Sequence, residues 1–423
     1  MDKIVSLAKR RGFVFPGSEI YGGLANSWDY GPVGVELKNN IKKLWWQFFV
    51  QAREDVVGLD STIIMSTKVW EASGHLQGFN DALVECKSCK NRFRPDDLDD
   101  KTKCLLCGGE FLPAREFNTM FKTNLGPVES NPVYLRPETA QGMFVDFKNI
   151  MSSTRLKIPF GVAQIGKGFR NEITPGNFLF RLREFEMMEM EYFIKEEDWE
   201  KYFEYWLGEV KQWLKLIGLK DENLYFHEIP DGERAHYSKR TIDIEYKYPF
   251  GQKELYGLAY RTDYDLKHHQ EKSGQDLSYY DEATKTRYIP HIIEPSFGVD
   301  RTFLAVMLEA YREEKDRINL KLPVELAPYK VAVFPLLANK PQLVEKARSI
   351  YDNLRQDLLV AWDDRGNIGK RYFSQDEIGT PFCVTVDFDS LEKDDVTVRD
   401  RDTMKQTRVK IDELAEFLKE KLE

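Results

Sequence analysis

Two stretches, Gly168-Phe169-Arg170-Asn171-Glu172 and Arg181-Leu182-Arg183-Glu184-Phe185-Glu186-Met187-Met188-Glu189-Met190-Glu191, decide how the chain is organised. The runs 162–169 and 185–193 are strand-like, and the loop 173–180 carries turn residues, so the sequence predicts an antiparallel hairpin. Because side chains alternate along a strand, Arg170 shares a face with Glu172. The return strand places on one face Arg181, Arg183, Phe185, Glu189 and Glu191. The hairpin is either a solvated element whose charges pair with one another, or a binding site for ligands that carry an anionic group, a planar ring and an amine.

Length and composition are those of a globular protein. The 423 residues are enough for two or three domains, and 42% hydrophobic with 31% charged residues indicates neither disorder nor a fibre. No apolar run approaches the ~18 residues that span a bilayer, and residues 1–5 lack a signal-peptide pattern, so we expect a cytoplasmic protein without a membrane partner. The net charge of -9 argues against indiscriminate nucleic-acid binding but leaves room for a local basic surface.

A further stretch, Ile292-Ile293-Glu294-Pro295-Ser296-Phe297-Gly298-Val299-Asp300-Arg301, begins as a strand, turns at glycine and continues as an apolar helix. Alternation places Glu294, Ser296 and Gly298 on one face. Arg301 falls in the first helical turn, where the helix dipole disfavours a cation. Either a carboxylate such as Asp300 pairs with Arg301, or a bound anionic ligand does.

Upstream, apolar residues recur at helical spacing over 35–53, which predicts a helix that packs on its own domain or forms a dimer interface. A strand is predicted at 61–65. His75 follows in a polar turn, where it contacts a ligand or makes local hydrogen bonds. Residues 136–142 enter another predicted helix, whose first turn suits Glu138.

Four of the five cysteines are clustered in two CxxC pairs, Cys86-Lys87-Ser88-Cys89 and Cys104-Leu105-Leu106-Cys107. Each pair can present two thiolates to one tetrahedral ion, and four thiolates close the shell with no position left for a substrate. The spacing predicts a structural zinc that supports folding, with free or redox-active thiols as the alternative. Cys383 lies alone in a strand-like run and is expected in a core.

Between these stretches the chain shows further periodic segments. Large apolar residues at helical spacing over 198–217 predict a buried helix face. Strands are predicted at 242–246 and 251–260. His268 and His269 follow without a second metal-like cluster, so we expect both in solvent, with a ligating role as the alternative.

The composition shifts after residues 321–328, which indicates a domain boundary. Beyond it the sequence predicts strands at 330–334, 358–361, 382–386, 396–401 and 407–411, and helices at 343–354 and 412–422. This alternation is typical of a small α/β domain. Basic residues gather at 365–371 and 399–408, where they either meet nucleic acid or form a solvated face.

The quoted stretches resemble known motifs. Phe169-Arg170-Asn171-Glu172, with Arg181 and Phe185, is similar to motif 2 of the class II aminoacyl-tRNA synthetases, and Gly298-Val299-Asp300-Arg301 is similar to motif 3. The 35–53 helix and the strand after it lie where the dimer motif, motif 1, is expected.

Longer segments in the same order resemble the dimeric glycyl-tRNA synthetases across most of residues 1–310, among them 10–23, 136–142 and 254–266. The tail resembles the anticodon-binding domain shared by the glycyl, threonyl, prolyl and histidyl enzymes. The resemblance implies an α+β fold, with a class II antiparallel-sheet catalytic domain over 1–325. It further implies an α/β anticodon-binding domain over 326–423. The zinc-ribbon-like insertion expected at 84–112 is not a class-defining motif and rests on the cysteine spacing alone.

The implied activity is that of a glycine-tRNA ligase, which activates glycine with ATP and transfers it to the 3′ end of tRNA-Gly. One alternative, a ligase that delivers glycine to another carrier, is disfavoured by the tail. The other is a non-catalytic nucleic-acid-binding accessory protein on the same fold. The joint presence of Arg170, Glu172, Glu254 and Arg301 favours the enzyme.

By motif match, Arg170 and Arg301 are catalytic: Arg170 holds the α-phosphate, and Arg301 grips the distal phosphates with Arg181. Phe185 offers its ring to adenine, and Glu172 accepts from the exocyclic amine. The implied ATP contacts are Arg170, Asn171, Glu172, Phe180, Arg181, Leu182, Arg183, Glu184, Phe185, Glu254, Leu255, Gly298, Val299, Asp300 and Arg301.

Glu254, alone or with Glu294, is the implied ligand for Mg²⁺, which prefers oxygen and bridges carboxylate to phosphate. The implied glycine contacts are Arg94, Glu138, Phe185, Glu189, Glu294, Ser296 and Gly298. Glycine has no side chain to grasp, so selectivity must exclude a methyl at Cα, and we expect no editing domain. The expected partners are ATP, glycine, tRNA-Gly and a second copy of the chain, and the expected cofactors are Mg²⁺ with ATP and structural Zn²⁺.

Overall fold

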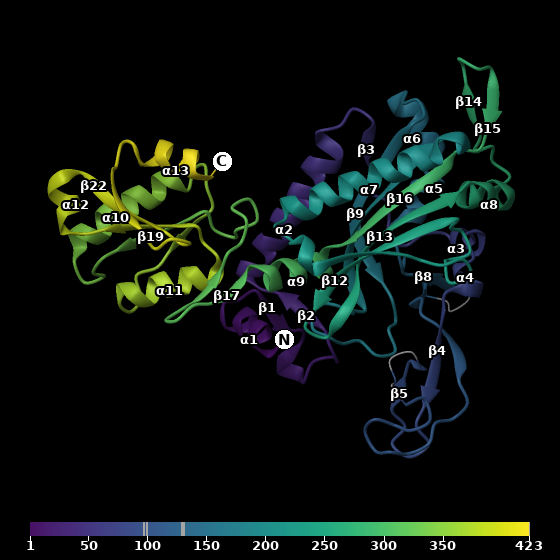
Figure 1. Ribbon diagram of the computed structural model, residues 1–423, viewed down its shortest axis with the longest axis horizontal. Helices are drawn as coiled ribbons and strands as arrows, with labels where there is room; N and C mark the ends of the chain where they lie inside the picture. Colours follow the sequence, from purple (N-terminus) through teal and green to yellow (C-terminus); the bar gives the residue numbers. More distant parts are fainter. Residues whose placement is uncertain (96–97, 99, 128–131, 423) are drawn as a thin grey trace.

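The computed structural model describes residues 1–95, 98, 100–127 and 132–422 (Figure 1). The predicted 84–112 insertion therefore includes residues 96, 97 and 99 outside the described ones, and the predicted 326–423 domain includes residue 423. The chain folds into a large unit on a seven-stranded sheet and a smaller C-terminal unit on a five-stranded sheet. Helices and strands are mixed in both, as the α+β prediction requires.

The predicted hairpin lies inside the sheet of the large unit. In spatial order the strands are β11 (Leu224–Glu228), β12 (Arg240–Tyr248), β13 (Gly251–Thr262), β16 (His291–Gly298), β10 (Glu184–Ile194), β9 (Phe160–Phe169) and β3 (Val56–Gly58). β9 and β10 pair antiparallel, with Phe185 opposite Gly168 and Glu189 opposite Gln164. β3 runs parallel to β9, and the other described pairs are antiparallel. The hairpin prediction is confirmed, and β16, which comes from the stretch 292–301, pairs with β10.

One face of this sheet is covered by helices. They are α2 (Pro32–Trp46), which continues as a π-helical turn over Gln47–Gln51, α7 (Trp199–Leu216) and α9 (Val299–Ala310). Trp45 meets the buried Phe297 of β16 with ring centroids 5.8 Å apart, and burial of such a side chain contributes about 1.5–3 kcal/mol. Because side chains alternate, Glu294 and Ser296 point to the opposite face.

The opposite face is only half covered. At one end, buried apolar residues such as Phe160, Val162 and Phe193 share a core with α5 (Ala140–Val145), α6 (Phe147–Thr154) and α8 (Tyr264–Ser273). At the other end the strands carry polar residues, including Glu189 and Ser296, that line a cavity. This alternation along the same strands leaves a concave polar surface beside a packed core.

The four-cysteine insertion extends away from the sheet (Figure 1). Its frame is β4 (Asn80–Glu85), which pairs with both β5 (Arg92–Phe93) and β6 (Arg115–Asn118). Cys86 and Cys89 lie in the turn between β4 and β5. Cys86 also forms an isolated bridge with Phe111, which joins the turn to the segment after the second CxxC pair.

The C-terminal unit has the predicted alternation of strands and helices. Its sheet order is β20 (Val360–Trp362), β19 (Val331–Pro335), β21 (Phe382–Val386), β22 (Asp395–Asp400) and β23 (Gln406–Lys410), and its helices are α10 (Pro341–Leu354), α11 (Ile368–Ile378), α12 (Phe388–Lys393) and α13 (Leu414–Leu422). The predicted strands and both predicted helices form. Sequence reasoning missed α11 and α12, because their few apolar residues lie among charges. Cys383 is buried in β21, as expected.

The structure contradicts the predictions made for residues 61–65 and for His269 of the large unit. Residues 61–65 form no strand, and Ile64 makes only an isolated bridge with Leu135. The Ser61 carbonyl instead accepts from Arg136 Nη1 at 2.8 Å, so a guanidinium takes the place of a strand neighbour. His269 is buried rather than solvated, and its Nε2 lies 2.8 Å from Gln141 Oε1.

The basic clusters of the C-terminal unit are largely structural. Arg371, Arg399 and Arg401 are each at most 4% exposed, so neither a solvated face nor a nucleic-acid surface describes them. Arg371 donates to the Pro335 carbonyl, and Arg399 pairs with the buried Asp376 at 2.8 Å. Exposed basic side chains remain at other positions of these segments, including Arg365, Lys370 and Lys405.

The two units meet through ion pairs. In α1 (Asp2–Arg10) and the residue after it, Arg10 and Arg11 pair with Glu377 of α11 at 2.9 and 2.5 Å. Arg317 pairs with Asp376 at 2.8 Å. These contacts connect the end of the first helix and the β17–β18 turn to the second unit.

The remaining elements are short: β1 (Val14–Pro16), β2 (Trp28–Tyr30), α3 (Thr67–Ala72), α4 (His75–Gly78), β7 (Lys122–Asn124), β8 (Pro132–Tyr134), β14 (Tyr279–Asp281), β15 (Thr286–Tyr288), β17 (Tyr311–Glu313) and β18 (Ile318–Leu320). Nowhere in the described part of the chain is a helix both long and apolar enough to cross a membrane.

Candidate active site

A cavity of about 570 Å³ lies over the open half of the sheet. The strand register places one row of residues across its floor: Gln164, Glu189, Ser296, Gly257 and Asp243 are opposite one another in successive strands. Glu189, Ser296, Gly257 and Asp243 line the cavity. The antiparallel ladder therefore brings together residues that are more than 100 positions apart in the chain.

Glu189 is fixed on this floor by three donors. Its Oε2 accepts from the Thr139 amide at 2.7 Å and from the Thr139 hydroxyl, and its Oε1 accepts from Ser296 Oγ at 3.0 Å. The side chain is 3% exposed. A buried carboxyl group held in this way is fixed in position to receive a ligand ammonium.

Glu138 is the second carboxylate of the cavity. It accepts from Gln141 Nε2 at 3.0 Å and lies 3.3 Å from His75 Nε2, while His75 Nδ1 is 2.7 Å from Ser73 Oγ. Burial opposes ionisation, but His75 and Arg261 hold the pKa of Glu138 below its usual range, so it is charged at neutral pH. The helix begins at Ala140, so the predicted first-turn position of Glu138 is wrong.

Glu294 is the third carboxylate, and it belongs to a buried ionic network. Arg261 donates to Glu294 at 2.8 Å and to both oxygens of Asp265 at 2.8 and 3.0 Å, and its guanidinium lies 3.9 Å from the centre of the Tyr237 ring. Burial raises the pKa of Glu294 to about 7, although Arg261 opposes the shift.

Glu191 lies on β10 two residues beyond Glu189. The register of β10 with β16, given by the pairs Glu189–Ser296 and Tyr192–Ile293, places Glu191 beside Glu294. It is fully buried, and neither carboxylate oxygen has a hydrogen-bond partner among the described residues. Burial, and next the charge of Glu294, raise the pKa of Glu191 far above its usual range. Glu191 is therefore a neutral acid beneath three carboxylates that face the cavity.

Two predicted phosphate-binding arginines lie at the other side of the cavity. Arg301 donates to the Glu254 carbonyl at 3.0 Å and pairs with the Glu254 carboxylate at 3.1 Å, over the ring of Phe180. Its carboxylate partner is thus Glu254 and not Asp300. Asp300 instead accepts from the Glu186 amide at 2.8 Å and from Tyr30 at 2.5 Å.

Arg170 is held over two aromatic rings. Its guanidinium carbon lies 5.3 Å from the centre of the Phe185 ring and 5.2 Å from that of Phe79, and its Nε donates to the Pro137 carbonyl at 3.1 Å. Phe185 in turn lies against Gly168, where a Cβ would approach its ring to 2.8 Å. A charged group and an aromatic plate therefore meet at one wall of the cavity.

Most residues implied for ATP line the cavity, namely Arg170, Glu172, Phe180, Arg181, Leu182, Phe185, Glu254, Leu255, Gly298, Asp300 and Arg301. The lining also includes every residue implied for glycine: Arg94, Glu138, Phe185, Glu189, Glu294, Ser296 and Gly298. Outside the lining lie Asn171, Arg183, Glu184 and Val299. Val299 is buried in α9, and Glu184 pairs with Lys167, whereas the Arg183 side chain donates to the Glu172 carbonyl at 3.2 Å.

Sequence reasoning missed several lining residues, of which Asp243 and Tyr237 are the most notable. Burial, followed by the charges of Glu254 and Glu245, raises the pKa of Asp243 to about 7. The alternating run at 242–246 contained the signal for its face, but only the register with β13 shows that this face is the floor of the cavity.

The four clustered cysteines converge in space. Their Sγ atoms all lie within 4.8 Å of one another, with Cys86 and Cys107 3.5 Å apart and Cys89 and Cys104 3.6 Å apart. Tetrahedral Zn–S bonds of about 2.3 Å would separate sulfurs by roughly 3.8 Å. The donor set and its spacing therefore fit one four-coordinate zinc ion.

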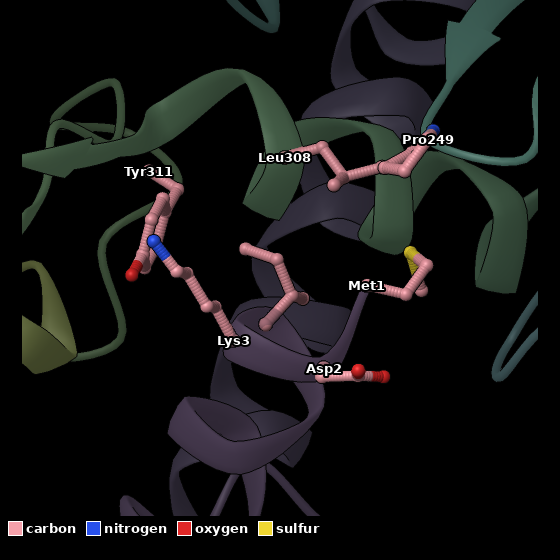
Figure 2. Close-up of a pocket in the computed structure, with 7 residues that line it drawn as sticks. Met1, Asp2, Lys3, Pro249, Leu308 and Tyr311 are labelled. Atoms are coloured by element: carbon pink, nitrogen blue, oxygen red, sulfur yellow. The ribbon is translucent and has the colours of Figure 1, made fainter.

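A second hollow, of about 360 Å³, lies between the start of α1 and the end of α9 (Figure 2). Its walls are mainly aliphatic, and Lys3 pairs with Glu313 at 2.7 Å. It holds no convergent set of titratable groups comparable to that of the central cavity.

Family models and relatives match the chain along its length. Residues 121–311 match "tRNA synthetase class II core domain (G, H, P, S and T)", and residues 330–421 match "Anticodon binding domain". Proteins named glycine--tRNA ligase are similar throughout: that of Clostridium acetobutylicum is 53% identical, covering 100% of this chain and 98% of the relative. Those of Geobacillus kaustophilus and Thermobifida fusca are each 52% identical, covering all of this chain and 99% and 98% of the relative.

The matches agree with the geometry, because the core model spans the strands that form the cavity and the second model spans the C-terminal unit. This chain therefore belongs to the glycine--tRNA ligase family, with a class II synthetase core and an anticodon-binding domain.

Proposed function

We propose that the protein ligates glycine to tRNA-Gly in two steps, through a glycyl-adenylate. The observation that carries the proposal is one cavity in which Arg170, Arg181, Arg301 and an aromatic plate lie with three carboxylates. One side suits a nucleotide triphosphate and the other a small ammonium. The full-length similarity to glycine--tRNA ligases supports this assignment.

In the first step a glycine carboxylate oxygen attacks the α-phosphorus of ATP, and the bond from that phosphorus to the bridging oxygen of pyrophosphate breaks. The nucleophile belongs to the substrate, so the protein has to align the groups and stabilise developing charge. Arg170 meets the α-phosphate, Arg181 and Arg301 hold the distal phosphates, and Phe185 supports the adenine ring. Glu172 accepts from the exocyclic amine.

Glycine binds on the carboxylate side of the cavity. Glu138 and Glu189 receive its ammonium with Glu294, and Ser296 and Arg94 complete the contacts. The site accepts no side chain, so it selects by excluding a methyl at Cα, and steric exclusion of a larger rival needs no editing step. In the second step the terminal adenosine hydroxyl of tRNA takes the glycyl group, and AMP leaves.

Two metals belong to the proposal. Glu254 lines the cavity, and its carboxylate pairs with Arg301. It would hold Mg²⁺ with the nucleotide, with Glu294 as an additional partner. Such an ion neutralises phosphate charge and orients the leaving group. Cys86, Cys89, Cys104 and Cys107 would hold a structural Zn²⁺.

We also propose a homodimer and a division of labour between residues 1–325 and 326–423. The loop before β2 exposes large apolar residues, with Ile20 and Tyr21 each 87% exposed, which a second copy would cover. The matches of family models to residues 121–311 and 330–421 support the two-part division. Sedimentation equilibrium of the full chain tests the dimer, and a monomer at micromolar concentration would contradict it.

Glycine-dependent exchange of labelled pyrophosphate into ATP, without tRNA, tests the proposed function. We expect exchange with glycine and much less with alanine, followed by charging of tRNA-Gly. No exchange with glycine, or equal exchange with alanine, would overturn the assignment.

A further inference from the structure

The base of the four-cysteine insertion touches three consecutive residues of the motif 2 stretch. Phe79, directly before β4, packs under the Arg170 guanidinium at 5.2 Å. The Asn171 amide donates to the carbonyl of Thr119, directly after β6, at 2.7 Å. Glu172 lies 4.0 Å from Arg94 Nη1. The insertion therefore forms part of the wall of the cavity beside the motif 2 stretch.

Among the described residues of the insertion, Arg94 is the one whose side chain lines the cavity. It follows β5 directly, and its other guanidinium nitrogen lies 3.2 Å from Asp81 of β4. The preceding Phe93 is paired with Val84 and packs on Phe111 with ring centroids 5.7 Å apart. The position of Arg94 is thus set by the β4–β5 hairpin.

Few contacts besides the cysteine cluster hold β5 in place. It is two residues long and lies at the edge of the three-stranded sheet β5–β4–β6, where it pairs with β4 only at Val84–Phe93 and Glu85–Arg92. An edge strand this short contributes little stability of its own. Cys86 and Cys89 form the turn that closes the β4–β5 hairpin, and the Lys87 amide donates to the Glu110 carbonyl at 2.9 Å beside the second CxxC pair. A metal shared by both pairs would join these segments.

We propose that the four-cysteine cluster positions Arg94: metal bound by the thiolates holds the β4–β5 hairpin and thereby keeps Arg94 between Asp81 and Glu172. The inference rests on the proposed function, because it makes the metal a determinant of substrate activation rather than of global folding. The large unit has its own core, in which no cysteine of the cluster takes part.

A double-mutant cycle in pyrophosphate exchange tests this coupling. Cys107 is exposed, so Cys107→Ser removes one ligand with the least disturbance of packing. We expect Cys107→Ser and Arg94→Ala each to lower kcat/KM by about 10- to 100-fold, as for loss of a charged hydrogen bond, and the double variant to be no worse than about threefold below Arg94→Ala. Multiplied losses in the double variant would overturn the proposal.

Two matched controls belong to the cycle. Arg92, in the same short strand, pairs with Glu85 and does not line the cavity, so Arg92→Ala should stay within about twofold of wild type. Cys383→Ala removes a cysteine from the other unit and should change neither the metal-to-chain ratio nor exchange. Loss of exchange in Arg92→Ala equal to that in Arg94→Ala would show a merely structural effect.

Hydrogen exchange gives a readout that does not depend on activity. The Cys86 amide donates to the Asn91 carbonyl at 2.9 Å across the β4–β5 hairpin. Wild-type protein stripped with a zinc chelator should lose protection at this amide, while amides of β10 keep theirs; this measurement also serves if Cys107→Ser does not accumulate. Unchanged protection at the Cys86 amide after metal loss would overturn the inference. If wild-type protein shows no glycine-dependent exchange, the proposed function fails instead, whatever the hydrogen-exchange result.

Discussion

Arg301 is joined to the fold by a partly exposed ion pair with Glu254 and by hydrogen bonds to the Glu254 and Phe180 carbonyls, and these few contacts predict a clean functional variant. The side chain of its partner Glu254 is 49% exposed, and such pairs contribute roughly 0–1 kcal/mol to stability. Arg301→Ala should therefore lower the free energy of unfolding by no more than about 1–2 kcal/mol. Pyrophosphate exchange should fall by at least about 100-fold, because preorganised charge at the phosphates is lost. A folded variant with normal exchange would refute the phosphate role.

Glu191 gives a prediction for the pH dependence of stability. Its pKa is raised well above 4.5 by burial, so between the two values the folded chain keeps a proton that the unfolded chain has released. Stability therefore falls as pH rises through this window, by about 1.4 kcal/mol per pH unit for this group.

Glu191→Gln removes this titration and keeps the shape of the side chain. Its free energy of unfolding, relative to wild type, should increase from pH 5.5 to pH 7.5 in urea titrations. A constant difference between the two proteins at both pH values would show that Glu191 is ionised in the fold.

At the scale of one element, the β9–β10 hairpin sets the adenine platform. Phe185 lies across from Gly168, and a Cβ at Gly168 would come within 2.8 Å of its ring. Gly168→Ala should push the ring into the cavity and raise the KM for ATP by about tenfold, at a cost of about 1–3 kcal/mol in stability. Gly176→Ala, in the loop, meets no atom within 4 Å and should be neutral. Equal ATP KM values in the two variants would contradict the platform role.

Elements with a strong local pattern could be predicted, and contacts set by long-range register could not. The hairpin, the β16–α9 junction and the α7 stripe follow from alternation or helical periodicity in the chain itself. The pairing of Arg301 with Glu254 and the burial of His269 depend on segments that meet only in the folded sheet. Residues 61–65 read as a strand, yet the Arg136 guanidinium binds the Ser61 carbonyl.

The same distinction applies to the candidate site. Motif resemblance selected residues of which most line one cavity, whereas Asp243 and Glu191 became visible only through their strand neighbours. The prediction that the basic clusters are accessible is wrong at Arg399 for a related reason, because composition does not show that this side chain is buried against Asp376.

At the scale of the whole molecule, Glu377 connects the two units. Its carboxylate accepts from both Arg10 and Arg11. Glu377→Ala should loosen the C-terminal unit relative to the cavity, lowering kcat/KM for tRNA charging by roughly fivefold or more, a usual size for coupling between sites. Pyrophosphate exchange should stay within about twofold of wild type, because the cavity is intact.

Glu416→Ala, at an exposed position of α13, is the matched control and should leave both reactions unchanged. If Glu377→Ala reduces exchange as much as charging, the contact supports the large unit itself and not the relation between the units.

The Arg301–Glu254 pair also has a consequence for which form of the nucleotide the cavity accepts. Each residue serves as the counter-ion of the other, so nucleotide entry amounts to ion exchange: phosphate replaces Glu254 at the arginine, and a cation must replace Arg301 at the carboxylate. Free ATP would leave Glu254 unneutralised against its phosphates. On the proposed function, the resting pair makes the protein a receptor for the metal–nucleotide complex as a unit, and free nucleotide a poor competitor for it.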